Sequence, residues 1–303
     1  MTQAEVFVGI DVSKARLSKA LAEYREHFAT RGNRPGRPNR ARTIEVTMMR
    51  LGKLFEPGKD LITGDLTPTT MRKLWEVRAA GKAVDTNLNT LSQARTFAAW
   101  LLKKGWIKTA ALFDGIEVLG ARRRGKPQLT EDESRKFLVH TLAEAVRGDA
   151  GAVAASCALL LGLRASEIAD RVVRDPDAGS TKLHITAAKT AAGVRTVKLP
   201  PVLQPLLKGL AAGKRPSERL FGDVDRSWVR RPVRRMCRTA GVPVVSAHGL
   251  RGTHSRLAVE AGISGEVVAA SLGHESFEVT KAHYAGSDAV AGARIDRVAA
   301  ALT

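Results

Sequence analysis

Six residues in the second half of the chain carry side chains that could carry out one reaction together. Arginine guanidinium groups are always charged and fork-shaped, so a pair of them can grip the oxygens of a phosphate. A tyrosine hydroxyl, whose free pKa is about 10, becomes a nucleophile when a base or a strong positive charge lies beside it. In chain order the six are Arg164, Lys189, His248, Arg251, His274 and Tyr284.

Most of these residues lie in short motifs. The motifs are Gly162-Leu163-Arg164-Ala165-Ser166-Glu167, His248-Gly249-Leu250-Arg251 and Leu272-Gly273-His274. Lys189 lies at the break of a predicted hairpin, and Tyr284 follows the last histidine. In this order and spacing, the motifs over about residues 128–290 resemble the tyrosine recombinase (phage integrase) family. The helical segment before them is similar to the core-binding domain of that family, although less closely.

The resemblance implies that a DNA phosphodiester is transferred to Tyr284, which would give a 3′-phosphotyrosyl intermediate. Arg164 and Arg251 would clamp the non-bridging oxygens, and His274 would add a third donor. Because arginines would supply the positive charge, neither a metal nor another cofactor is expected. The covalent bond would conserve the energy of the broken one, so rejoining would need no ATP.

The resemblance also implies how protons would move. His248 would be the base or proton relay, and Lys189 would be the acid that protonates the 5′-hydroxyl leaving group. Glu167, three residues after Arg164, is expected to orient that arginine in a supporting role.

Each assignment has a competing interpretation. Lys182 and Lys198 lie on the same predicted hairpin as Lys189, so the position of the turn decides which lysine is the acid. Tyr24 is the only other tyrosine in the chain and the alternative nucleophile. His248 and His274, taken alone, would more often be structural. The remaining candidates, His254 and His283, are expected to be structural or adjacent to DNA.

The charge of the chain indicates its partner. Its 303 residues hold 49 lysines and arginines against 30 acidic residues, a net charge of +19. Such an excess favours a polyanion, and double-stranded DNA comes first. Aromatic residues make up only 5% of the chain, which disfavours a single-strand binder that stacks bases. No apolar run is long enough to span a bilayer and no signal peptide is evident, so a cytoplasmic, nucleoid-associated protein is expected, with no membrane partner.

The two cysteines do not indicate a disulfide or a metal site. Cys157 lies in an apolar run and is expected in the core, whereas Cys237 lies among arginines. No Cys/His spacing is typical of a zinc site.

Three basic segments are expected to contact DNA phosphates. One is the Pro- and Gly-rich loop 31–40, the second is the basic stretch 121–126, and the third is the segment 226–238, which holds six arginines and no acid. As a helix, the third would be basic on several faces and would need a counter-charge. The residues selected are Arg31, Arg34, Arg37, Arg122, Arg123, Arg124, Arg230, Arg231, Arg234 and Arg235.

Hydrophobic periodicity predicts a mainly α-helical protein with one small antiparallel β-sheet. The first part should hold helices at 13–28, 41–55, 68–80 and 85–104, with a cap at Thr67. Helices are then predicted at 131–147, with a capping box from Thr130, and at 150–163, 201–211, 227–240, 249–261, 264–271 and 276–284. Residues 182–200 alternate apolar and polar side chains around a short break, which predicts a hairpin.

These elements suggest a helical core-binding domain over 1–119, a linker over 120–127 and a catalytic domain over 128–303 with a C-terminal tail helix. The resemblance implies a C-shaped clamp around DNA. It also implies a homo-tetramer that exchanges strands through a Holliday junction. An apolar stripe at 295–302 would dock on a neighbouring subunit or on its own domain.

Three functions remain open at this level. The first is a site-specific recombinase, either a phage or mobile-element integrase or a chromosome-dimer resolvase. The second is a type IB topoisomerase-like enzyme, and the third is a DNA-binding protein without catalytic activity. The segment 8–14 is similar to the start of an RNase-H-like transposase, but no matching carboxylates follow it, so we interpret it as coincidence.

Overall fold

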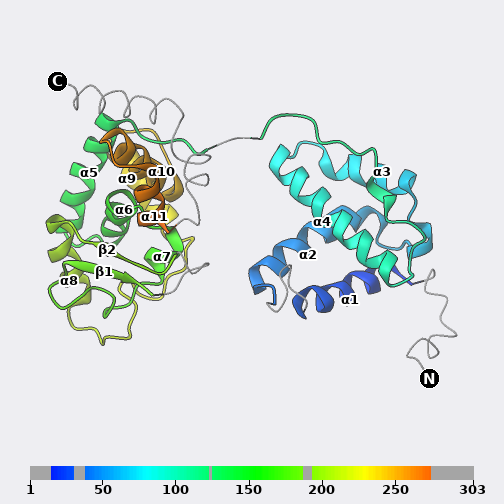
Figure 1. Ribbon diagram of the computed structural model, residues 1–303, viewed down its shortest axis with the longest axis horizontal. Coiled ribbons are helices and arrows are strands. Elements are labelled where there is room, and N and C mark those ends of the chain that lie inside the picture. The colour runs from blue at the N-terminus through cyan, green and yellow to red at the C-terminus, as the bar shows by residue number, and fades with distance from the viewer. Residues whose placement is uncertain (1–14, 31–37, 123–124, 187–192, 274–303) are drawn as a thin grey trace. The chain divides into compact units, whose positions relative to one another are not determined.

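The computed structural model describes residues 15–30, 38–122, 125–186 and 193–273. The chain forms two compact units, Met1–Arg123 and Arg124–Thr303 (Figure 1). The boundary between them lies inside the predicted linker. Among the described residues the secondary structure is mainly helical with one two-stranded sheet, as the sequence predicts.

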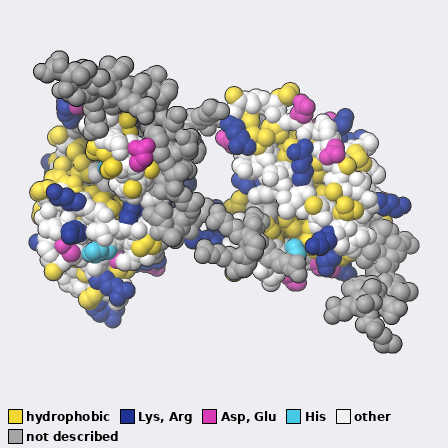
Figure 2. Space-filling view, viewed as in Figure 1, with side chains coloured by type: hydrophobic (Ala, Val, Ile, Leu, Met, Phe, Trp, Pro, Cys, Tyr) yellow, Lys and Arg dark blue, Asp and Glu magenta, His cyan; other side chains and the backbone are white. Residues whose placement is uncertain are grey.

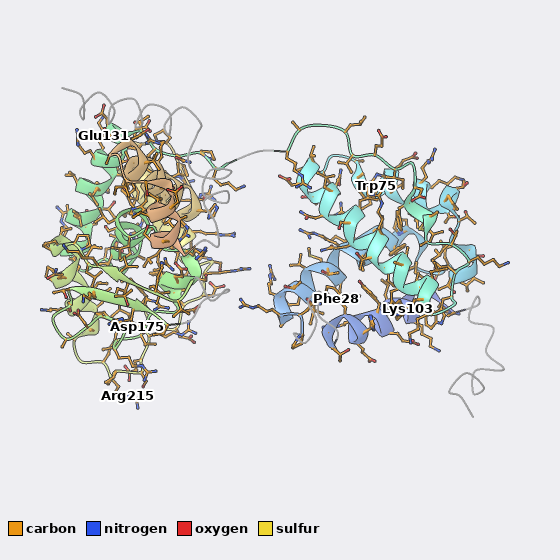
Figure 3. All side chains as sticks on the ribbon, viewed as in Figure 1. Phe28, Trp75, Lys103, Glu131, Asp175 and Arg215 are labelled. Carbon is orange, nitrogen blue, oxygen red and sulfur yellow. The ribbon has the colours of Figure 1, made fainter. Side chains whose placement is uncertain are left out.

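The first unit is built from helices packed around an aromatic core. These helices are α1 (Leu17–Thr30), α2 (Ala41–Phe55), α3 (Pro68–Ala79) and α4 (Val84–Lys103), with 3-10 turns at Glu56–Gly58, Thr63–Asp65 and Ala111–Phe113. The bounds of α2, α3 and α4 agree closely with the predictions, whereas α1 begins at Leu17 rather than 13 and ends at Thr30 rather than 28. The Thr67 side chain caps α3 by accepting a bond from the Thr70 backbone amide. Phe28 and Trp75, labelled in Figure 3, are both buried in this core.

The second unit surrounds one buried and mainly apolar helix. Its helices are α5 (Glu131–Val146), α6 (Ala150–Leu160), α7 (Ala165–Ala169), α8 (Gln204–Ala211), α9 (Arg230–Thr239), α10 (Ala247–Glu260) and α11 (Gly265–Leu272), and the 3-10 turn Pro201–Leu203 precedes α8. Helix α6 packs against α5, α9 and α10, and its residues from Gly151 to Leu159 are buried. The predicted capping box is present at the start of α5, where Thr130 and Glu133 bond each other's backbone amides.

The predicted hairpin is present. Strands β1 (Lys182–Ile185) and β2 (Arg195–Lys198) pair in antiparallel fashion, with Leu183 opposite Val197 and Ile185 opposite Arg195. Because side chains alternate along a strand, Arg195 and Val197 lie on the same face. This face continues to the buried Leu199.

Several predicted helices of the second unit extend beyond the observed ones, and for two of them the structure shows the reason. Helix α6 ends at Leu160 rather than 163, because Gly162 adopts a left-handed conformation (φ +60°) that turns the chain before Arg164. Helix α9 begins at Arg230 rather than 227, because the Asp225 carboxylate accepts bonds from the backbone amides of Ser227 and Trp228 and holds a turn there.

The expectation that the arginine-rich helix is basic on several faces is also wrong. One face of α9 is apolar and buried, through Pro232, Val233, Met236 and Cys237. The arginines of the helix therefore all lie on its opposite, exposed side.

Some predictions lie outside the described residues, namely the helix at 276–284 and the apolar stripe at 295–302. Within the described ranges, no helix combines the length and apolar character that a bilayer crossing requires.

Candidate active site

Arg164 is positioned by a sharp turn between two helices. After the left-handed Gly162, Arg164 has an extended backbone (φ −70°, ψ 150°) and forms the N-cap of α7. Its guanidinium donates from Nη2 to the Gly273 carbonyl (3.2 Å) and from Nη1, more weakly, to the Leu272 carbonyl (3.4 Å). The side chain is 35% exposed, so solvent or a ligand can still reach it.

Arg251 approaches the same point from α10 but is fully buried. Its Nη1 donates to the Gly162 carbonyl and its Nη2 to the Leu272 carbonyl, each at 2.6 Å. Gly162 and Arg251 are 89 residues apart in the sequence. The structure therefore brings the two predicted clamp arginines together at the end of α11.

The C-terminal end of α11 offers backbone carbonyls that accept hydrogen bonds from positively charged side chains. The helix begins with a cap from the Ser264 side chain and ends at Gly273, which is left-handed (φ +67°). Carbonyl groups at a helix C-terminus carry partial negative charge and have no partner within the helix. The two arginines satisfy these carbonyls directly before His274, which lies outside the described residues.

Glu167 is the negative centre of this cluster and is 4% exposed. Its carboxylate accepts bonds from the Arg164 amide (2.9 Å) and Arg164 Nη1 (2.6 Å), and it lies 3.8 Å from Arg251 Nη1. Burial raises the pKa of this carboxyl, but the bonds and charge of Arg195, followed by the bonds from Arg164, lower it to about 2. Glu167 is thus ionised throughout the neutral range, and the expected contact with Arg164 is present.

The sequence interpretation missed two arginines of this cluster. Arg195 on β2 forms an ion pair with both carboxylate oxygens of Glu167. Arg171, two residues after α7, is 2% exposed and pairs with Asp175, which Figure 3 labels (Nη1 to Oδ2, 2.9 Å). Arg171 also donates to the backbone carbonyls of Glu167 (2.6 Å) and His184 (2.7 Å). The signal for Arg195 was its place in the alternating strand, on the same face as Val197 and Leu199.

His248 lies in the first turn of α10, one helical turn before Arg251, and is exposed. The turn is capped by the Ser246 hydroxyl, which accepts from the Gly249 amide (3.0 Å). His254, on the same helix, is different: its Nδ1 lies 3.0 Å from the Leu159 carbonyl. Burial lowers the pKa of His254, and the charge of Arg251 acts in the same direction. His254 is therefore a packed, neutral side chain, which agrees with the structural interpretation.

The competing tyrosine is part of the core of the first unit. Tyr24 is 2% exposed, and its ring contacts Phe97 with centroids 5.0 Å apart. Burial raises its pKa to about 12, which makes its hydroxyl a poor nucleophile. Tyr284 and Lys189 lie outside the described residues.

The described DNA-contact candidates are exposed. Arg230, Arg231 and Arg234 lie on the open side of α9, whereas the Arg235 guanidinium pairs with Asp149. Arg122 lies 3.7 Å from an Asp85 carboxylate oxygen, in a pair that is mostly exposed. Basic side chains are spread over the visible face of both units (Figure 2). The other candidates, Arg31, Arg34, Arg37, Arg123 and Arg124, fall outside the described residues.

Both cysteines are buried thiols. Cys157 lies in α6, as expected, and burial raises its pKa to about 12. Cys237 lies on the buried face of α9. Within the part of the chain that the structure describes, no group of three His, Cys, Asp or Glu side chains is arranged to hold a metal ion.

Known proteins resemble this chain over most of its length. The phage integrase family model matches residues 128–290. The tyrosine recombinase XerC of Mycobacterium sp. (strain KMS) is 26% identical over 243 residues, which cover 74% of this chain and 79% of the relative.

Solved structures share the fold. The integrase of the Tn1549 transposon, in complex with a circular intermediate DNA, aligns with a TM-score of 0.70 at 16% identity, over 94% of this chain and 99% of the other. A lambda integrase dimer bound to a COC′ core site aligns with a TM-score of 0.67 at 18% identity, over 91% and 96% of the two chains.

The family match spans more than half of the chain and includes each motif around the charged cluster. The arginines of the first and second motifs meet at the backbone of the third. This chain belongs to the phage integrase family of tyrosine recombinases, enzymes that cut and rejoin DNA.

Proposed function

We propose that the chain is a site-specific recombinase that cleaves duplex DNA through Tyr284 and leaves a 3′-phosphotyrosyl bond. The observation that carries this proposal is the convergence of Arg164 and Arg251 on the Leu272 carbonyl. Two guanidinium groups that share one oxygen acceptor can equally share the oxygens of one phosphate. In the reaction, Arg164 and Arg251 bind the scissile phosphate and stabilise the charge that develops on it.

The remaining roles follow from chemistry and chain order. His248 lies one turn before Arg251 on α10 and acts as base or proton relay for the Tyr284 hydroxyl. Lys189, between the two hairpin strands, protonates the 5′-oxygen that leaves, and His274 donates to the phosphate. Glu167 is a positioning residue because its buried carboxylate orients Arg164.

We propose the integrase of a phage or mobile element as the biological role, acting as a tetramer on double-stranded DNA. A lambda integrase tetramer bound to a Holliday junction shares the fold with a TM-score of 0.67 at 18% identity. The predicted core-binding domain 1–119 and the predicted catalytic domain 128–303, joined by the linker 120–127, would both bind the DNA. The exposed arginines of α9 would bind phosphates, and the stripe 295–302 would dock on a neighbouring subunit.

The test uses a nicked suicide duplex that carries the DNA site recovered from the covalently cut junction in the host genome. Wild-type protein should form a covalent adduct at Tyr284, and Tyr284→Phe should form none. Tyr24→Phe is the matched control, since it removes the only other tyrosine hydroxyl of the chain, and it should keep the adduct.

No adduct with wild-type protein on the verified site would overturn the proposal. Substrates with two sites then separate the possible roles. Recombinant products support a recombinase, whereas relaxation of supercoils without exchange would indicate a topoisomerase-like enzyme. Insertion between two unlike sites supports an integrase, whereas exchange only between identical sites supports a resolvase.

A further inference from the structure

Arg195 connects three parts of the catalytic unit through one side chain. Its Nη1 and Nη2 bind the two carboxylate oxygens of Glu167, at 3.2 and 3.1 Å. Its Nε donates to the Ser271 carbonyl at 2.7 Å, 76 residues further along the chain, and Nη1 also donates to the Gly193 carbonyl. With the side chain only 8% exposed, this guanidinium joins β2, α7 and the end of α11.

Three arginines donate hydrogen bonds to the backbone carbonyls at the end of α11. Ser271 accepts from Arg195, Leu272 accepts mainly from Arg251, and Gly273 accepts from Arg164. Three consecutive carbonyls are thus fixed, and the next residue in the chain is His274. The position of the C-terminal end of α11 therefore depends on Arg195 as much as on Arg164 and Arg251.

Arg195 also controls how strongly Glu167 holds Arg164. The charged groups facing Glu167 are Arg164, Arg171, Arg195 and Arg251. Arg164 is the most exposed partner of this carboxylate, at 35%, against 8% for Arg195 and 0% for Arg251. If Arg195 were absent, the buried carboxylate would depend mainly on Arg164 for its counter-charge, and would draw this guanidinium away from any phosphate.

We propose that Arg195 is a positioning residue for strand cleavage, which neutralises Glu167 and fixes the end of α11 so that Arg164 and Arg251 can meet the scissile phosphate. This inference rests on the proposed function. A lysine cannot replace the arginine fully, because one ammonium group lacks the fork that reaches two carboxylate oxygens and a carbonyl together.

The test measures single-turnover adduct formation on the suicide duplex with wild type, Arg195→Gln, Arg195→Lys and Arg215→Gln. Arg215 is the matched control, since it pairs with Glu218 while 83% exposed, and Figure 3 shows it at the edge of the second unit. We expect Arg195→Gln to cleave about 10- to 100-fold more slowly. Its Kd for the same duplex should stay within about threefold, because Arg195 is not expected to touch DNA.

The pH profile separates positioning from a general loss of structure. Between pH 5 and 8 Glu167 stays ionised in the wild type, because its pKa is about 2. Removing Arg195 raises the pKa of Glu167, and a protonated Glu167 no longer draws Arg164 away from the phosphate. The rate deficit of Arg195→Gln relative to the wild type should therefore be smaller toward pH 5 than at pH 8. Arg195→Lys should show a pH profile close to that of the wild type, because it keeps the charge beside Glu167, but it should not reach the full rate.

Several results would overturn the proposal. One is a wild-type rate in Arg195→Gln, and another is an equal loss of rate and DNA affinity with an unchanged pH profile. If Arg195→Gln does not fold, Arg195→Lys carries the test, and a wild-type rate there would contradict the need for the fork. Absence of an adduct in the wild type would overturn the proposed function as well, so the two failures can be told apart.

Discussion

The two units of this protein have cores of opposite kinds. The first is aromatic: Tyr24, Phe97, Trp100 and Trp106 form successive ring contacts with centroids 5.0 to 6.0 Å apart. The core of the second is mainly alanine, leucine and valine. Among the described residues, every buried charged side chain lies in the second unit. These are Glu167, Arg171, Asp175 and Arg251, and the Arg195 side chain beside them is 8% exposed.

This difference shows where the protein accepts the free-energy cost of burying charged side chains, which is at the proposed active site. Taking ions out of water is costly, and an apolar replacement often stabilises a fold as well or better. The first unit avoids this cost because its core is packed from apolar side chains. The second unit keeps a buried charge cluster at the point where three motifs meet, which is typical of a functional site.

The largest effect is expected from Glu167→Ala, which would leave Arg195 and Arg251 buried without their carboxylate. Breaking a buried pair costs about 3–5 kcal/mol. Hydrogen exchange should show faster opening of α6 and α10 and unchanged α4. The control Glu218→Ala breaks an exposed pair with Arg215 and should cost less than about 1 kcal/mol. Equal losses in the two variants would show that the buried charge cluster matters no more to stability than an exposed ion pair.

The next largest effect is expected in the dependence of the unfolding free energy on pH in the acid range. Because the folded pKa of Glu167 is about 2, below its ordinary 4.5, its stabilisation is complete above pH 4.5 and is lost as pH falls toward 2. The contribution is on the order of 3 kcal/mol. Denaturant unfolding of wild type and Glu167→Gln should therefore differ most above pH 4.5 and converge toward pH 2. A difference that is constant with pH would contradict this.

Gly162→Ala tests the turn that brings the first motif to the second. Gly162 has φ +60°, and an added Cβ would lie 2.6 Å from Leu272 Cδ2 and 2.8 Å from His254 Cδ2. Strain and overpacking together should destabilise the second unit by about 2 kcal/mol. Gly209→Ala, within α8 and with no atom within 4 Å, should instead be neutral or stabilising. Thermal unfolding of both variants measures these changes. A Gly162→Ala variant as stable as the wild type would contradict the role of this turn.

The smallest effect is expected in the first unit. Tyr24→Phe keeps the ring that packs on Phe97 and removes only the hydroxyl, so unfolding should change by less than about 1 kcal/mol. Tyr24→Ala, which removes the ring, should cost several kcal/mol. A large effect of Tyr24→Phe would show that the first core also depends on a buried polar group.

Local patterns predicted most of the helices and the hairpin because their causes are local. The cap at Thr67, the capping box at Thr130 and the alternation along 182–200 each involve neighbours in the sequence. The motif order likewise identified Arg164 and Arg251. What could not be predicted was the acceptor they share, the end of α11, since Arg164 and Gly273 are 109 residues apart.

Arg195 could have been found from the sequence with one further step. Val197 and Leu199 occupy the inward face of the strand, so the period of two places Arg195 on this face as well. An arginine at a position where the pattern requires an apolar side chain indicates a buried partner. The identity of that partner, Glu167, again depends on tertiary structure.

The bonds that join the start of the second unit to α10 determine when this protein can become active during its synthesis. The Leu129 amide donates to the Thr253 hydroxyl and its carbonyl accepts from Arg256, across 124 and 127 residues. In the first unit, the Gln93–Thr47 bond spans only 46 residues. On the ribosome the first unit can therefore fold early, whereas the second waits until α10 has emerged. Glu167 is made before Arg195 and Arg251, so a growing chain carries no assembled charge cluster until α10 has been made.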